Sequence, residues 1–280
     1  MKIILNIVKY LFVIILSICI LGIIILKVLS SSLLDESYVL RKMEESNYYE
    51  KIYNQVESNF EKYILQSGLE EDVIKGIITQ EQVKEDTEAI IDNIYRGTKT
   101  EIGEEELRKK LDENIRNSLG DRKLSATEEL SIEQFEETIC NEYKKTVVST
   151  EYNEKINKIL EQTKNVYETV KIGLYSFTVV IAILLIVLNI GNITRAISNF
   201  GISFAVSGIF YLVINILINN KIKIANIKIL NTSISEVIQN VILGILEQIV
   251  TISISCVIIG LVLILLGNIL NGHKNKIEGN

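Results

Sequence analysis

The sequence has no proline and no tryptophan, one histidine (His273) and three cysteines (Cys19, Cys140 and Cys256). Proline is the commonest cause of a helix kink, so its absence favours long unbroken helices. A single histidine excludes a His-based catalytic triad and a His-rich metal site. Two cysteines lie in apolar runs and Cys140 stands alone in the polar region, so no intrachain disulfide framework is expected. Cys140 is expected to pack as a small, semi-buried side chain.

Acidic residues are almost missing from the two ends of the chain. Residues 31–170 contain 32 acidic and 19 basic side chains, whereas the other 140 residues contain 3 acidic and 10 basic ones. This division predicts lipid as the environment of the ends and water as that of the middle. It excludes an ordinary cytosolic enzyme. It also excludes a nucleic-acid-binding protein with a basic face, because the large polar region is acidic.

Four apolar runs are about as long as the roughly 20 residues that a bilayer requires. They are Tyr10–Leu26, extended to Leu29 if Lys27 snorkels, then Ile172–Ile190, Phe200–Ile218 and Ile249–Leu270. The apolar core of a cleaved signal peptide is shorter, roughly 7–15 residues, so a retained anchor is favoured. Cleavage near Ser30 is the alternative.

Residues 235–248 are apolar but include Glu236, Gln239 and Glu247. A carboxylate at mid-membrane would cost roughly 2.5–3.5 kcal/mol on insertion scales, so we expect an interfacial helix before the last span. The sequence thus predicts an all-α, four-span protein. Its expected parts are an N-terminal anchor (1–30), an acidic helical domain (31–170), a three-span membrane bundle (171–270) and a tail (271–280).

Basic residues in short loops predict the orientation, because they are enriched on the cytoplasmic side. If four helices span, five of them fall on one side: Lys2, Lys9, Arg195, Lys274 and Lys276. Both termini are therefore expected in the cytoplasm of a cell-membrane protein, with residues 31–170 outside. The third connection counts against this orientation, because it would hold three lysines outside: Lys221, Lys223 and Lys228.

The polar region shows apolar residues every three or four positions, which is typical of amphipathic helices. One continuous helix is expected from Asp35 to Gly68 and a second from Thr79 to Gly97. A third is expected to begin at Glu104 and to end before a turn at Gly120 and Asp121, and Ser131 is expected to cap a fourth. A last helix has no breaker before Ile172, so it is expected to run from about Glu151 to Ile190. Such a helix would transmit movement between the outer domain and the membrane, or serve only as a stalk.

Catalytic and ligand-binding patterns are missing. The sequence contains no glycine-rich phosphate loop and no calcium loop, and its acidic residues have the spacing of solvated helix faces. We therefore expect no enzyme activity, no cofactor and no metal site.

The membrane helices contain stripes of small and polar residues. Helix packing is the main interpretation, because small residues let helices approach closely; a polar path around Asn189, Asn215 and Glu247 is the alternative. The positions singled out are Asn189, Gly201, Ala205, Gly208, Asn215, Glu247, Ser253, Cys256 and Gly260.

The stretch from Leu34 to Tyr53 resembles a segment that follows the first span in uncharacterised bacterial membrane proteins. That resemblance implies one anchor, a helical outer region and a terminal membrane bundle, and it implies no activity. The layout is also similar to the membrane subunit of cell-division-type mechanotransmitting ABC systems. This chain departs from them in the short connection Gly191–Asn199 and in the nine residues before the first span, which leave little for an ATPase to grip.

We therefore expect a non-catalytic surface sensor, scaffold or accessory subunit. Its partners would be the lipid bilayer and a protein or envelope component bound by the outer helices. A transport-related subunit, with or without a separate ATPase, is the alternative. An oligomer is compatible with either.

Overall fold

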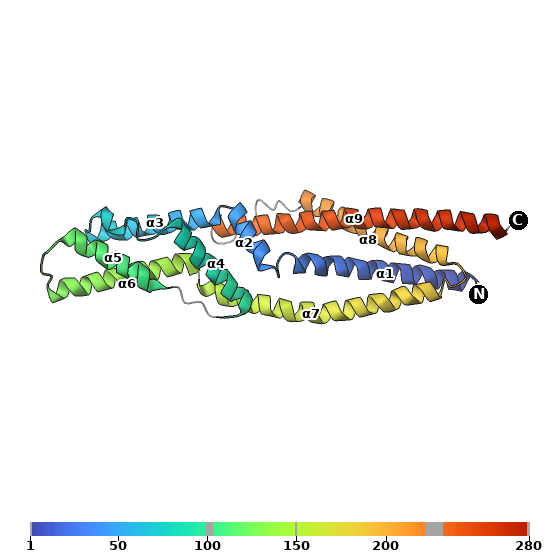
Figure 1. The fold of residues 1–280 in the computed structure, drawn as a ribbon, viewed down its shortest axis with the longest axis horizontal. Coiled ribbons are helices and arrows are strands. Elements are labelled where there is room, and N and C mark those ends of the chain that lie inside the picture. Colours follow the sequence, from blue (N-terminus) through green and yellow to red (C-terminus); the bar gives the residue numbers. More distant parts are fainter. Residues whose placement is uncertain (1, 99–102, 149, 222–231, 279–280) are drawn as a thin grey trace. The chain divides into compact units, whose positions relative to one another are not determined.

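The computed structural model describes the backbone of residues 2–98, 103–148, 150–221 and 232–278. This part of the chain is helical and contains no strand (Figure 1). Its elements are α1 (Lys2–Ser30), α2 (Glu36–Glu45), α3 (Tyr48–Ser67), the 3₁₀ helix η1 (Glu71–Ile74), α4 (Gln80–Arg96), α5 (Glu104–Leu119), α6 (Ala126–Val148), α7 (Thr150–Val187), α8 (Ile193–Lys221) and α9 (Thr232–Glu278).

Four of the described helices are long and apolar enough to cross a membrane. They lie in α1, α7, α8 and α9, at Ile4–Ser30, Ile156–Val187, Ile193–Ile218 and Ser233–Gly272. The prediction of an all-α protein with four spans is therefore confirmed. The expected spans fall inside these ranges except at the end of the second, because α7 ends at Val187 and a turn follows.

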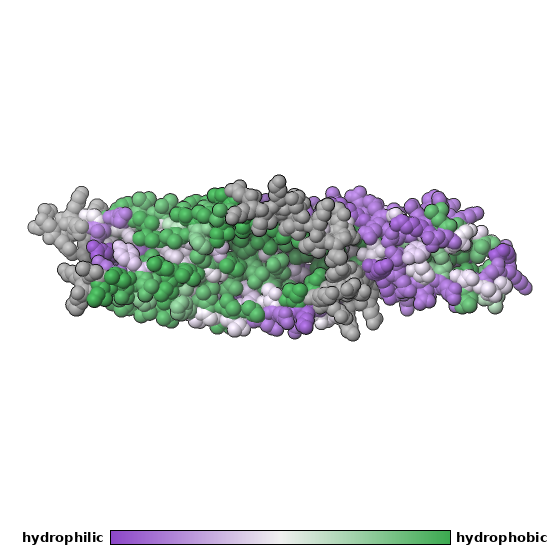
Figure 2. Space-filling model, turned by 180° about the vertical axis from the view of Figure 1, so that it is seen from behind, coloured by the Kyte–Doolittle hydropathy of each residue, from purple (hydrophilic) through white to green (hydrophobic). Residues whose placement is uncertain are grey.

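The chain forms two compact units. The membrane unit comprises Met1–Asp35, Thr163–Lys228 and Ile238–Asn280, and the polar unit comprises Glu36–Gln162 and Ile229–Val237. The surface of the membrane unit is largely apolar, whereas that of the polar unit is rich in hydrophilic residues (Figure 2). The two units therefore match the two solvents that the charge distribution indicated.

The core of the membrane unit draws on all four long helices. It contains Val13, Leu16, Ile20, Ile24 and Val28 of α1, Ile181 and Leu185 of α7, Tyr211 of α8 and Cys256 of α9. The α1 residues recur every three or four positions, so one face of α1 lies against the other helices while other positions, such as Ile14 and Ile18, are exposed.

The polar unit has a separate core in which α3, α4, α5 and α6 pack together with η1. Each helix buries a face of residues three or four positions apart, as the amphipathic spacing predicted. The side chains of Leu107, Leu111 and Ile115 on α5 are fully buried, and those of Ile139 and Tyr143 on α6 lie at most 1% exposed. Burial of these apolar faces is the main source of stability in a helical unit of this kind.

Several predicted helix ends are confirmed. The Thr79 side chain accepts a hydrogen bond from the Gln82 amide at 3.1 Å, which satisfies one of the free donors at the start of α4. Gly68 and Gly97 follow α3 and α4 with φ of 73° and 72°, a left-handed conformation that glycine adopts without steric cost. Gly120 ends α5 with φ of 67°.

The prediction of one continuous helix from Asp35 to Gly68 is wrong. Helix α2 ends at Glu45 and α3 begins at Tyr48, because Asn47 adopts a left-handed φ of 51° between them. Asparagine tolerates this conformation better than most residues with a side chain. The Ser46 hydroxyl donates to the carbonyl of Lys42 at 2.6 Å, which satisfies an acceptor at the end of α2.

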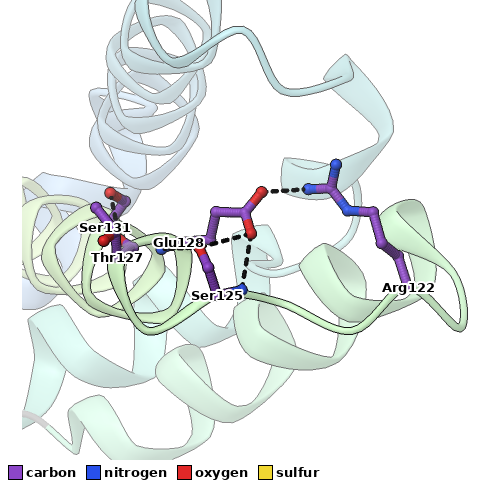
Figure 3. A network of polar contacts seen from close by, with 5 residues as sticks. All are labelled: Arg122, Ser125, Thr127, Glu128 and Ser131. Atoms are coloured by element: carbon purple, nitrogen blue, oxygen red, sulfur yellow. Dashed lines mark hydrogen bonds and ion pairs between the residues drawn. The ribbon is translucent and has the colours of Figure 1, made fainter.

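The predicted cap at Ser131 is also wrong, because α6 begins at Ala126. Ser125 and Glu128 form a capping box (Figure 3): the Ser125 hydroxyl accepts from the Glu128 amide at 3.3 Å, and a Glu128 carboxylate oxygen accepts from the Ser125 amide at 2.8 Å. Arg122 lies 2.8 Å from the other Glu128 oxygen. The Ser131 hydroxyl instead donates to the Thr127 carbonyl inside the helix.

Two helices have residues in both units. Helix α7 runs from Thr150 to Val187, so the predicted continuous helix into the second span is confirmed over this range. Helix α9 runs from Thr232 to Glu278, so residues 235–248 continue into the last span without a break. The expected tail is helical as far as Glu278. Lys223 and Lys228, which counted against the predicted orientation, lie outside the described residues.

Replacing Tyr143 by Phe is expected to destabilise the polar unit. The buried Tyr143 hydroxyl donates to a carboxylate oxygen of Asp86 at 2.5 Å and so joins α6 to α4; burial raises the pKa of both groups. Loss of the donor leaves the half-buried carboxylate unpaired and should lower the free energy of unfolding by about 1–2 kcal/mol. Pulse proteolysis of the full chain in detergent over a urea series measures this.

Tyr63→Phe is the matched control. It removes a hydroxyl 3.2 Å from a Glu142 oxygen, in a partly buried contact whose tyrosine is more exposed than Tyr143. This variant should unfold close to the wild-type urea concentration. Equal effects of the two substitutions would contradict the structural role given to the Tyr143 hydroxyl.

Candidate functional site

The small residues singled out on α8 and α9 meet at one helix–helix contact. A Cβ atom added at Gly260 of α9 would lie 2.5 Å from the Ala205 amide nitrogen and 2.6 Å from the Gly201 carbonyl oxygen of α8. A Cβ atom at Gly208 would lie 2.5 Å from the Ser253 carbonyl oxygen. The two backbones therefore approach each other so closely that side chains larger than hydrogen have no room at these glycines.

A second contact of α8 consists of hydroxyl groups that donate to the backbone of α1. Ser203, Ser207 and Tyr211 donate to the carbonyl oxygens of Val13, Ser17 and Leu21 at 3.1, 2.9 and 2.8 Å. Each donor and each acceptor is four residues from the next, so the series follows both helices for two turns. In lipid such hydrogen bonds stabilise helix packing, because no water competes for the groups.

The polar residues of the alternative interpretation do not converge. Asn189 follows the end of α7, and Asn215 lies about six turns along α8, roughly 33 Å from its start at 1.5 Å per residue. Both are buried, with exposed fractions of 2% and 8%, whereas Glu247 is exposed. These three side chains therefore do not line one common path.

The remaining membrane positions have local roles. The Ser253 hydroxyl donates to the carbonyl of Ile249 at 2.6 Å, within its own helix. Cys256 is buried in the core shared by the four long helices. The Asn189 amide donates to the Leu185 carbonyl at 2.8 Å, and its Oδ1 finds no hydrogen-bond partner among the described residues.

A row of charged residues joins α5 to α6 in the polar unit. Glu104 pairs with Lys144 at one end, and at the other Arg116 lies 3.2 Å from a Glu129 oxygen. Between these pairs two carboxyl groups are neighbours, because Glu136 of α6 lies close enough to Asp112 of α5 for the charge of Asp112 to raise the pKa of Glu136.

Glu136 is 6% exposed, and its Oε1 has no hydrogen-bond partner within the described part of the chain. Burial raises the pKa of Glu136, and the charge of Asp112 raises it further, while Arg108 and Arg116 act in the opposite direction. Burial and the nearby charge of Asp112 thus favour the neutral form of the Glu136 carboxyl group.

Cys140 lies one turn further along α6 and is fully buried. Burial raises the pKa of its thiol, and Arg108 opposes this shift. The thiol is thus held in its protonated, weakly nucleophilic form. The described residues contain no group of three or more histidine, cysteine, aspartate or glutamate side chains that could hold a metal ion.

Sequence reasoning missed the hydroxyl series and the carboxyl pair. Ser203, Ser207 and Tyr211 repeat every four residues, which was a detectable signal for a polar helix face. The pairing of Glu136 with Asp112 had no sequence signal, because it depends on how two separate helices align.

Comparison with known proteins assigns no family to either unit. No protein-family model, no curated protein and no solved structure matches the chain. No residue role can therefore be transferred from a relative, and function has to be inferred from the residues of this chain.

Gly260→Ala is expected to destabilise the membrane unit by about 1–3 kcal/mol, because the new methyl group meets the backbone of α8, which cannot give way like a flexible side chain. Gly272→Ala on the same helix is the control: nothing lies within 4 Å of its Cβ position. Alanine favours a helix over glycine, so this variant should be as stable as wild type or slightly more so. Thermal unfolding of purified protein in detergent, followed by size-exclusion chromatography, distinguishes the two. An unchanged midpoint for Gly260→Ala would refute the close contact.

Glu136→Gln is expected to stabilise the polar unit at neutral pH and to change it little near pH 4. A carboxyl group whose pKa rises on folding stabilises the folded state below its ordinary pKa of 4.5. That contribution is lost as the pH rises through the folded-state pKa, and glutamine, which stays neutral, does not lose it. Urea unfolding at pH 4 and pH 7 measures the difference, with the exposed Glu133→Gln as control. A variant less stable than wild type at pH 7 would show that the charged form of Glu136 is the stabilising one.

Proposed function

We propose that this protein is a non-catalytic multi-pass protein of the cell membrane whose polar unit binds a protein or envelope partner outside the cell. In this role it acts as a sensor, scaffold or accessory subunit. Lys9, near the start of α1, and Arg195, in the first turn of α8, support cytoplasmic termini, because basic residues at the ends of spans are enriched on that side.

The observation that carries the proposal is that two helices, α7 and α9, each contain residues of both units. The first turns of α9 belong to the polar unit, where Glu236 forms an ion pair with Lys51 of α3. A partner that moves the polar unit would therefore act on helices that continue into the membrane.

The end of the polar unit where α3 and α5 end and α6 begins is the best candidate for partner contact (Figure 1). Leu65 and Leu130, near this end, are 74% and 53% exposed. Arg122 with Glu128 and Arg116 with Glu129 fix the neighbouring turn (Figure 3 shows the first pair). An ordered surface with exposed leucines binds a partner at a lower entropic cost than a mobile one.

The transport-related alternative has less support. A transport path requires polar groups that face one cavity, but Asn189 follows the end of α7, whereas Asn215 lies roughly 33 Å along α8 from the start of that helix. The exposed Glu247 does not connect them.

Photo-crosslinking in the intact source cells tests the proposal. A photoreactive amino acid at Leu65 or Leu130 of the full chain should give adducts with one recurrent envelope component, identified by mass spectrometry. The same substitution at Glu85, an exposed position on α4, serves as the control and should give at least about five times less adduct. Asn215→Leu should leave the adducts unchanged.

Two outcomes would contradict the proposal. Recurrent capture of an ATPase, abolished by Asn215→Leu, would favour a transport subunit. Equal labelling at Leu65, Leu130 and Glu85 would show that this end of the polar unit binds no specific partner.

A further inference from the structure

Helix α7 exposes apolar side chains on several faces of its membrane span, including Ile172, Val179 and Ile183, and one set of exposed apolar residues continues as a stripe beyond the span. In the membrane unit the stripe consists of Val166, Val170, Phe177, Val180, Leu184 and Val187, each between 39% and 61% exposed. Successive members are separated by three, four or seven residues. This is the heptad spacing by which helices pack in left-handed coiled coils. Gly173 occupies the heptad position between Val170 and Phe177.

The heptad spacing continues toward the N-terminal end of the same helix. Ile159 and Ile156 are seven and ten residues before Val166, and they are 62% and 48% exposed. The apolar run within α7, Ile172–Val187, covers roughly 24 Å at 1.5 Å per residue, so a hydrocarbon core of about 30 Å extends only some four residues beyond it. Ile159 lies 13 residues before that run, about 20 Å further along the helix, where lipid tails do not reach. Contact with lipid therefore explains only part of this spacing.

Charge along α7 follows the same register. Five charged residues lie between Ile156 and Val187: Lys158, Glu161, Lys164, Glu168 and Lys171. None of the five lies in the stripe or at the two heptad positions that flank it. Two copies of the helix packed in parallel would thus meet without like charges opposite each other. Gly173 adds an open position, because nothing lies within 4 Å of its Cβ site, and small residues let helix backbones approach.

We propose that the α7 stripe is the contact surface for a second copy of this chain, which packs in parallel along α7. The parallel direction follows because all copies cross the membrane with the same orientation. The contact joins α7 of one protomer to α7 of its partner and leaves the α1–α8 and α8–α9 contacts within each protomer unchanged. It does not depend on the proposed partner-binding role.

Disulfide crosslinking of the full chain in native membranes tests this contact. Single cysteines are introduced by Val166→Cys, Val170→Cys or Glu168→Cys, with Cys19, Cys140 and Cys256 replaced by alanine. Glu168 is the matched control, because it lies at the same depth but away from the stripe. Oxidation should give at least about five times more covalent dimer at 166 and 170 than at 168, and Gly173→Ile should lower the yield at 170 several-fold.

If the cysteine-free background does not accumulate, a photoreactive amino acid at the same three positions gives the same comparison in the otherwise unchanged chain. Equal yields at the three positions, a maximum at 168, or only monomer at all of them would refute the proposal. Photoproducts with lipid alone at 166 and 170 would show that the stripe faces the bilayer.

Discussion

Within a bilayer the polar groups of a helix have no water to bind, and the apolar side chains of neighbouring helices gain nothing over contact with lipid. The membrane unit meets this constraint through α8. One side of α8 presents hydroxyl groups to the carbonyls of α1, and another presents glycine and alanine to the glycine and serine of α9. The first contact depends on hydrogen bonds and the second on close approach of backbones. Both are available in lipid, and together they connect three of the four spans.

The polar unit solves a different problem, because water makes burial of apolar faces favourable. Its helices accordingly carry amphipathic spacing, side-chain caps and ion pairs four residues apart, such as Glu106 with Lys110 at 2.8 Å. The buried carboxyl group of Glu136 is the exception, since its burial and the charge of Asp112 outweigh the opposing effect of Arg108 and Arg116 and disfavour its charged form. A neutral residue at this position of the α5–α6 contact would cost less free energy to bury at physiological pH. We therefore expect Glu136 to contribute less to stability as the pH rises.

Much of the fold could be predicted from sequence, since hydropathy alone separates the two solvents and three- and four-residue spacing identifies the helices. The two wrong helix boundaries lie where a short polar side chain determines the backbone conformation at a helix end. Asn47 interrupts an apolar pattern that continues across it, and Ser125 was overlooked because Ser131 also precedes apolar residues. The small-residue stripes on α8 and α9 were visible in the sequence. Their alignment, like that of Glu136 with Asp112, depends on the relative shift of two helices, which a single sequence does not specify.

Continuity of α9 changes how the last span is understood. Residues 235–248 carry two glutamates, which argued for an interfacial or pore-rim helix that leads into the last span. Instead Glu236 is neutralised by Lys51 within the polar unit, and Glu247 is exposed while its neighbour Gln248 lies 2.9 Å from the Ser31 hydroxyl at the end of α1. Charge is thus accommodated along one unbroken helix by different means at different positions. The first turns of α9 thus depend on an ion pair in the polar unit, and Gly260, further along the same helix, depends on close backbone contact with α8.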